Sequence, residues 1–207
     1  MDETSVLYEY VPKHTLAEKG DGNGAAAGLI DCKSCITAVI AVAASGRELP
    51  ILFILPGQPD GSIARNEIER YNNGHYYITQ PKAWMDTNVW EFYIEEVLSR
   101  EITGPSQIIV DNLKVHVNQH SIDLVANHCM SEVCALPANT TSVCQPLDVG
   151  VMGPLKASIK KKWLHSNRGR TASEKRENVI NIAIQSYNEL KETTIKKAWK
   201  VALDIGE

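Results

Sequence analysis

Three aspartates stand at places where an ordered chain can present carboxylates for metal chemistry. Asp2 begins a predicted strand, Asp111 follows the short apolar run 108–110, and Asp148 stands near the beginning of a predicted helix. Carboxylate oxygens are the ligands that Mg²⁺ and Mn²⁺ prefer, and these ions keep several waters when they bind. The three positions therefore form a candidate site for hard divalent cations.

Each aspartate taken alone also has a simpler structural explanation. Asp2 could be a mobile terminal acid, Asp111 could stabilise a turn, and Asp148 could favour the positive end of a helix. His116 is likewise more often a buried structural histidine than a general base. The functional hypothesis depends on the motifs in which all three aspartates occur together.

The elements that would position these aspartates follow from apolar periodicity and from helix and turn signals. The predicted strands cover residues 5–11, 35–44, 49–55, 108–110 and 132–136. The predicted helices cover residues 87–98, 121–129, 147–163, 174–190 and 194–203. We expect Gly153-Pro154 to kink the third of these helices or to reset its start, and Thr171 and Glu174 to form a capping box before the fourth. Residues 57–83 show no sustained period and predict a long irregular connection.

The order of these elements predicts an α/β fold. The two strands on either side of Ser45-Gly46-Arg47 read as a β-hairpin, and strands alternate with helices after it. This arrangement predicts a mixed sheet flanked by helices, with an additional C-terminal helical segment. The same order is found in ribonuclease H-like folds.

Three segments resemble the DDE superfamily endonuclease domain of pogo and Tigger-type transposases, which is related to jerky and centromere protein B. The motifs are Asp2-Glu3-Thr4, then Ile108-Ile109-Val110-Asp111-Asn112 with His116, and finally Leu136-Pro137, Asn139-Thr140-Thr141, Gln145-Pro146-Leu147-Asp148 and Gly150-Val151. The third is long enough to be specific by itself. The resemblance covers residues 1–165 and implies a catalytic domain over that range, with residues 166–207 as a helical extension of the same domain.

The resemblance implies a metal-dependent DNA endonuclease and strand-transferase, the core of a cut-and-paste transposase. Asp2, Asp111 and Asp148 take the place of the three catalytic, metal-binding acids, and Asp111 is the expected bridging ligand. Two Mg²⁺ or Mn²⁺ ions about 3.5–4 Å apart can stabilise the attacking and leaving oxygens of an in-line phosphoryl displacement. Asn112 and His116 are expected to orient carboxylates, water or phosphate around that site. Gln145 and Asn139 are expected to shape the loop that leads to Asp148.

The charge pattern supports a nucleic-acid partner in spite of a net charge of −4. Residues 156–176 hold eight basic residues against Glu174 alone, which gives this stretch a charge of +7. Cations that face phosphates supply most of the affinity for DNA. The residues expected to contact DNA are Lys156, Lys160, Lys161, Lys162, Arg168 and Arg170.

Other partners and compartments are limited by what the sequence lacks. No apolar run approaches the roughly 20 residues of a membrane helix, and the glycine-rich residues 20–28 lack the Gly-Lys-Ser/Thr ending of a nucleotide-binding P-loop. Five cysteines with irregular spacing indicate reduced thiols; Cys32 and Cys35 form a lone pair at zinc spacing, for which core packing is the better interpretation. We expect a nuclear protein whose partner is DNA, with no membrane and no nucleotide cofactor; a homodimer is compatible with this reading.

Two function classes stay open on the sequence alone. The three aspartates favour the enzyme, whereas the lack of an upstream helix-turn-helix domain and of strand residues before Asp2 favours a decayed or host-retained interaction domain. A serine hydrolase is a distant third, because no Gly-x-Ser-x-Gly motif is present. If the aspartates crowd together, Asp111→Asn should leave the metal-free protein melting no lower than the parent.

Overall fold

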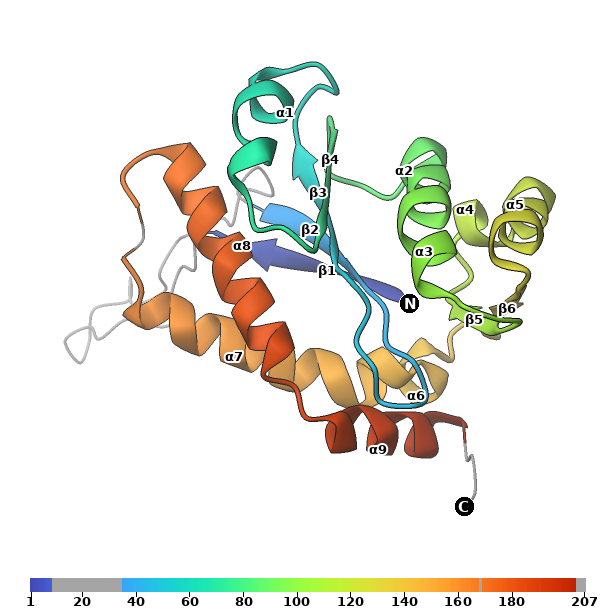
Figure 1. Ribbon diagram of the computed structural model, residues 1–207. Helices are drawn as coiled ribbons and strands as arrows, with labels where there is room; N and C mark the ends of the chain where they lie inside the picture. The colour runs from blue at the N-terminus through green and yellow to red at the C-terminus, as the bar shows by residue number, and fades with distance from the viewer. Residues whose placement is uncertain (9–34, 168, 204–207) are drawn as a thin grey trace, which may run out of the picture.

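The computed structural model describes residues 1–8, 35–167 and 169–203 and arranges them as a mixed α/β fold (Figure 1). A four-stranded sheet stands at the centre with helices on both sides. Its strands, in spatial order, are β1 (Asp2–Leu7), β2 (Cys35–Ile40), β3 (Leu52–Pro56) and β4 (Tyr76–Gln80). The β1–β2 and β2–β3 pairs are antiparallel, whereas β3 and β4 are parallel.

The predicted hairpin is confirmed, and its turn closes at Gly46. An isolated bridge between Val42 and Glu48 continues the β2–β3 pairing beyond the named strands. Gly46 has a φ of 92°, a backbone conformation that glycine adopts without steric cost. The first strand begins at Asp2, earlier than the predicted residue 5. Residues 9–11 of that prediction, the loop 20–28 and Cys32 lie outside the described residues.

The prediction that residues 57–83 form an irregular connection was wrong in part. This stretch contains α1 (Ser62–Asn66), the 3₁₀-helix η2 (Ile68–Arg70) and the whole of β4. Tyr76-Tyr-Ile-Thr-Gln has the aromatic and β-branched residues of a strand, but it lacks a clear alternation because it lies at the edge of the sheet. Its contact with β3, including Tyr77 stacked on Phe53 at 5.6 Å, supplies the stability that local sequence does not reveal.

The two faces of the central sheet carry separate hydrophobic cores. One core packs the β1–β3 face that holds Val6 and Ile40 against α7 (Met152–His165), α8 (Ala172–Asn188) and α9 (Glu192–Leu203). The other core packs the opposite face against α2 (Thr87–Phe92), the π-helix η3 (Tyr93–Leu98) and α5 (Gln119–Cys129). Figure 1 shows these two helical layers on either side of the sheet. Because side chains alternate along a strand, Asp2 and Glu3 face opposite layers.

A second, two-stranded sheet carries the second motif. It pairs β5 (Gln107–Val110) with β6 (Glu132–Ala135) in parallel. The sequence predicted one mixed sheet, but the structure connects the two sheets through a single described bond, in which the Met1 nitrogen donates to the Ile109 carbonyl oxygen at 2.7 Å. The segments around this sheet include α3 (Ser99–Glu101), α4 (Lys114–Val117) and α6 (Thr141–Cys144). β1 and β5 therefore meet only where β1 begins.

The helix predicted from residue 87 is confirmed. The sequence favours Thr87 as its N-cap, but the cap is the preceding residue. Asp86 is the N-cap, and its carboxylate accepts a hydrogen bond from the Val89 nitrogen at 3.0 Å. The helix continues through η3 and α3 to Glu101. Its apolar positions are buried, among them Trp90 and Tyr93, which pack with ring centroids 5.9 Å apart.

The helix predicted over residues 147–163 is confirmed, but its start is not reset: helical turns begin at Leu147 and continue past Gly153-Pro154. A π-helical turn, η4 (Leu147–Val151), leads into α7 at Met152. Pro154 has no backbone N–H and so cannot donate the α-helical hydrogen bond to the carbonyl of Gly150. The wider π turn is one way in which a helix accommodates this loss.

The C-terminal helices also agree with the sequence. The Thr171 and Glu174 capping box is present at the start of α8, and α9 begins two residues earlier than predicted. α9 packs closely on η4: a Cβ added to Gly150 would lie 2.7 Å from the Cβ of Ala198. No helix in the described part of the chain is long and apolar enough to span a bilayer, and the four described cysteines carry free thiols.

Gly150→Ala is expected to destabilise the fold by about 1–3 kcal/mol, because the added methyl group overlaps α9. Ala198→Gly alone should also destabilise, by about 1 kcal/mol, through the helix propensity of glycine. Urea denaturation of both single variants and the double variant measures the coupling between the sites. We expect the double variant to lose less free energy of unfolding than the two single variants lose when their losses are added. A loss equal to that sum would contradict this account of the contact.

Candidate metal and nucleic-acid site

The structure brings the first and third aspartates close enough to repel each other. Asp2 is partly buried on β1, and its Oδ1 accepts a hydrogen bond from the Glu3 nitrogen at 2.9 Å. Burial, followed by the negative charges of Asp148 and Glu3, raises the pKa of Asp2 to about 7. An aspartate with such a pKa is in a place where a second negative charge costs free energy and a cation would relieve it.

The turn that carries Asp148 is fixed on both sides. Leu147 and Val151 are buried in the core, whereas Asp148 between them is exposed on the first turn of η4. Just before the turn, the buried side chain of Gln145 donates from Nε2 to the Met1 carbonyl oxygen at 2.9 Å. Gln145 was expected to shape the loop before Asp148, and its observed bond connects that loop directly to the start of β1.

Asp111 lies in a different local environment, against a histidine. His116 on α4 is fully buried and its Nδ1 is 2.8 Å from Asp111 Oδ1, which also accepts a hydrogen bond from the Leu113 nitrogen. The other ring nitrogen of His116 lies 3.2 Å from Glu3 Oε1. Burial lowers the pKa of His116, but the carboxylates of Glu3 and Asp111 outweigh it and the net shift is upward. His116 therefore links Asp111 to Glu3 on β1 through its two ring nitrogens.

Glu3 is a site residue that the sequence analysis did not single out. Its Oε1 and His116 Nε2 are close but not aligned for a hydrogen bond, so both count among the buried polar atoms without a partner. Trp90 Nε1 and the Tyr93 hydroxyl, on α2 and η3, are also buried polar atoms without a described partner. The available signal was strand alternation, which points Glu3 toward the helical layer opposite Asp2.

Asn112 makes its contact away from the carboxylates. Its Nδ2 donates to the Leu136 carbonyl oxygen at 3.0 Å, which joins the ends of β5 and β6. This bond holds Leu136, the first residue of the third motif, beside Asn112 of the second motif. The hydrogen bond of Asn112 thus positions backbone at the ends of β5 and β6.

The three predicted aspartates have the chemistry that hard divalent cations require. Their side chains do not, however, converge on one point in the described structure. Asp2, Asp111 and Asp148 offer only oxygen ligands, and the pKa of Asp2 is raised by burial and by the charges of Asp148 and Glu3, which a bound cation would offset. Within residues 1–8, 35–167 and 169–203, no three His, Cys, Asp or Glu side chains gather closely enough to hold a metal ion. The structure couples Asp2 to Asp148, and it places Asp111 with His116 and Glu3.

The predicted DNA-contacting residues divide into exposed and paired groups. Lys156, Lys160 and Lys161 are exposed on α7 and form no ion pair with any described residue. Lys162 is engaged instead, since its Nζ lies 2.6 Å from both carboxylate oxygens of Glu189, the C-cap residue of α8. Arg170 is exposed, and Arg168 lies outside the described residues.

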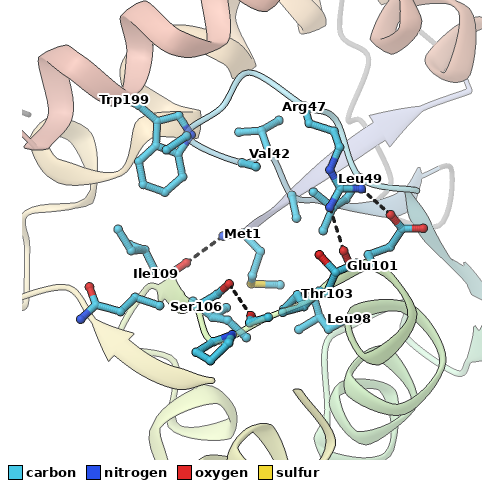
Figure 2. Close-up of a pocket in the computed structure, with 18 of the residues that line it drawn as sticks. Met1, Val42, Arg47, Leu49, Leu98, Glu101, Thr103, Ser106, Ile109 and Trp199 are labelled. Carbon is cyan, nitrogen blue, oxygen red and sulfur yellow. Dashed lines mark hydrogen bonds and ion pairs between the residues drawn. The ribbon is translucent and has the colours of Figure 1, made fainter. Parts of the chain in front are cut away.

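A cavity of about 600 Å³ opens beside Met1 and is separate from the carboxylates (Figure 2). Its walls are mostly apolar and include Val42, Leu49 and Trp199. The one acid among its lining residues is Glu101, whose Oε2 is 2.6 Å from the Arg47 guanidinium. This cavity therefore does not have the carboxylates of a metal site.

Comparison with known proteins identifies one family. The family model described as DDE superfamily endonuclease matches residues 33–199, which is most of the chain. The match includes Asp111 and Asp148, begins after Asp2, and continues past residue 165 into α9. No solved structure matches the chain.

Asp2→Asn is expected to stabilise the metal-free protein at pH 8. The raised pKa means that the folded protein holds a proton on Asp2 more tightly than the unfolded chain does. The parent therefore loses stability as the pH rises from about 4 through about 7, whereas the amide does not. At 1.36 kcal/mol per pKa unit, Asp2→Asn should gain at most about 4 kcal/mol in free energy of unfolding over the parent at pH 8. Solvent screening of the partly exposed carboxylate reduces this gain.

Urea denaturation at pH 5 and pH 8 in the presence of a chelator measures this difference, with Asp111→Asn as the matched control. Because Asp111 faces His116, the control should lose stability, which reverses the expectation from the sequence that it melts no lower than the parent. An equal gap between Asp2→Asn and the parent at both pH values would contradict the proposed repulsion.

Proposed function

We propose, from the premise that the chain belongs to the DDE superfamily endonuclease family, that it is the catalytic core of a cut-and-paste DNA transposase. The reaction is metal-dependent hydrolysis and transfer of phosphodiesters. The observation that carries the proposal is the electrostatic coupling of Asp2 to Asp148, two acids 146 positions apart that the fold brings together beside the start of β1. Acids whose pKa values are shifted by burial together with a specific charged neighbour collect at functional sites.

The finer assignments rest on the motifs. We place the chain with the pogo and Tigger-type members, with a ribonuclease H-like fold in which β1, the end of β5 and the turn η4 carry the acids. We assign residues 1–165 to the catalytic domain and residues 166–207 to its helical extension, and we propose that the protein acts in the nucleus. The four-stranded mixed sheet with a helical layer on each side supports the ribonuclease H-like fold.

The residues proposed to hold the cations are Asp2, Asp111 and Asp148. Bound Mg²⁺ or Mn²⁺ would supply activation of the attacking oxygen and stabilisation of the departing one. The chain's own contribution is to hold the carboxylates: Gln145 ties the Asp148 turn to the start of β1, and His116 orients the carboxylate of Asp111. In the hydrolytic step a P–O bond forms to water and the bond from phosphorus to the DNA 3′-oxygen breaks.

The rival proposal is an interaction domain that retains the fold without catalysis. One observation favours it, namely that the described side chains do not converge as a set of three ligands. Cleavage assays separate the two proposals, since only the enzyme needs the carboxylate charges.

Asp111→Asn is expected to abolish nicking of plasmid DNA in Mg²⁺ or Mn²⁺ while DNA affinity changes little. The amide keeps the shape of the side chain and its acceptor for the Leu113 nitrogen, but it loses the charge that cations require. A second readout is thermal stability, because Mn²⁺ should raise the melting temperature of the parent more than that of the variant. Equal nicking by parent and variant would exclude the three-carboxylate mechanism, and a parent that never nicks would favour the interaction domain.

Changing Lys156, Lys160 and Lys161 together to glutamine is expected to weaken DNA binding and flatten its dependence on salt. Each lost phosphate contact lowers the slope of log K against log salt by about 0.9. Lys162→Gln is the matched control, because its ammonium is already engaged by Glu189 and should contribute little to this slope. Fluorescence anisotropy with a duplex at several salt concentrations provides the slopes. If the triple variant keeps the slope of the parent, DNA takes a path that does not follow α7.

A further inference from the structure

Trp84 is an exposed aromatic side chain on a turn that the fold holds firmly. Two thirds of its surface, 67%, is accessible, although it follows the buried residue Ala83 in the connection between β4 and α2. Single exposed apolar residues are common and need no explanation by themselves. The turn that presents Trp84 is what sets it apart.

Gln80 and Asp86 fix this turn at its two ends. Gln80 Oε1 accepts hydrogen bonds from the backbone nitrogens of Lys82 at 2.6 Å and of Trp84 at 3.0 Å. Gln80 Nε2 donates to Asp86 Oδ2 at 3.1 Å, while the other oxygen of Asp86 caps α2. The backbone around Trp84 is therefore held in one geometry before any ligand binds.

Ala83 carries the strain of this geometry. It is buried, has a φ of 54°, and its carbonyl accepts a hydrogen bond from Thr37 Oγ1 at 2.7 Å. A non-glycine residue in the left-handed region costs on the order of 1 kcal/mol or more, and such residues collect at ligand-binding sites. The strain turns Ala83 inward and Trp84 outward.

The turn lies on the sheet near the acidic residues. Thr37, which holds Ala83, is the register partner of Ser5 on β1, three residues beyond Asp2. At about 3.3 Å per residue along a strand, Ser5 is roughly 10 Å from Asp2. Thr37 shares its face of the sheet with Val39, the register partner of Glu3, and this face is opposite the one that carries Asp2. The Trp84 turn therefore lies on the side of Glu3, whose partner His116 contacts Asp111, and DNA held by Asp111 runs on this same side of the sheet.

The neighbouring cation completes the arrangement. Lys82 Nζ lies over the Trp84 ring, 5.4 Å from its centroid, and Lys82 is itself exposed. Proteins that bind single strands combine an aromatic ring, on which a base stacks, with a cation that contacts the backbone. A flexible apolar contact for a protein partner would require neither the fixed turn nor the cation.

We propose that Trp84 is a stacking platform for an unpaired nucleobase of the DNA held at the catalytic site, with Lys82 contacting an adjacent phosphate. The inference rests on the proposed function and extends it: the chain recognises DNA with at least one unstacked base near the scissile phosphate. Every base has a flat face, so the platform has little sequence preference.

The test uses Trp84→Ala, Trp84→Phe and Lys82→Gln, with a 12-nucleotide thymidine strand and a blunt duplex of equal length. Binding is measured in chelator, so that cleavage does not occur. Trp84→Ala should weaken single-strand binding by about 5- to 100-fold, whereas Trp84→Phe, which retains a ring, should stay within a few-fold of the parent. Lys82→Gln should lower the salt slope for the single strand by about 0.7.

The matched control is Met130→Ala, which removes an equally exposed apolar side chain, 67% accessible, at the end of α5. It should bind both DNAs as the parent does. Intrinsic fluorescence adds a direct readout, because Trp90 and Trp163 are buried and Trp84 is the most exposed tryptophan described. Iodide should quench Trp84 in the free protein, and the thymidine strand should protect it.

Several outcomes would overturn the platform. They are unchanged single-strand binding by Trp84→Ala, equal losses for alanine and phenylalanine, equal losses on single strand and duplex, or a tryptophan that iodide does not reach. If the parent binds duplex and nicks it while Trp84→Ala binds the single strand normally, only the platform fails. If the parent binds neither DNA, the proposed function fails and the platform fails with it.

Discussion

Two hydrogen bonds on the backbone of Met1 connect the three segments that carry the acidic residues. Its nitrogen donates to Ile109 in β5, and its carbonyl accepts from Gln145, just ahead of Asp148. Both bonds are buried, so their polar atoms would be costly to leave without partners. The start of β1 is therefore the point on which the spacing of Asp2, Asp111 and Asp148 depends.

The fold arranges negative charge around this point in two different ways. Burial, followed by the negative charges of Asp148 and Glu3, raises the pKa of Asp2, whereas Asp111 and Glu3 both lie against the buried imidazole of His116. Repulsion between Asp2 and Asp148 favours cation binding, and His116 fixes the orientation of the Asp111 carboxylate. In the proposed metal site, Asp2 and Asp148 thus supply the negative charge that attracts a cation, and His116 holds Asp111 in a fixed orientation.

The sequence predicted those elements whose signals are local. The amphipathic pattern from residue 87, the capping box at Thr171 and the apolar run before Asp111 each depend on neighbouring residues, and each is present. The edge strand β4 was missed because its stability comes from β3, and Glu3 because His116 lies far away in the sequence. Lys162 appeared available for DNA for the same reason, since Glu189 reaches it from another helix.

The central claim is that Asp2, Asp111 and Asp148 together bind divalent cations, and Mn²⁺ titration followed by electron paramagnetic resonance tests it most directly. Free and bound Mn²⁺ are counted on the same sample, for the parent and for each aspartate-to-asparagine variant. The account predicts two ions per chain for the parent and weaker binding of at least one ion in every variant. A parent that binds no Mn²⁺, or three variants that bind it as the parent does, would contradict it.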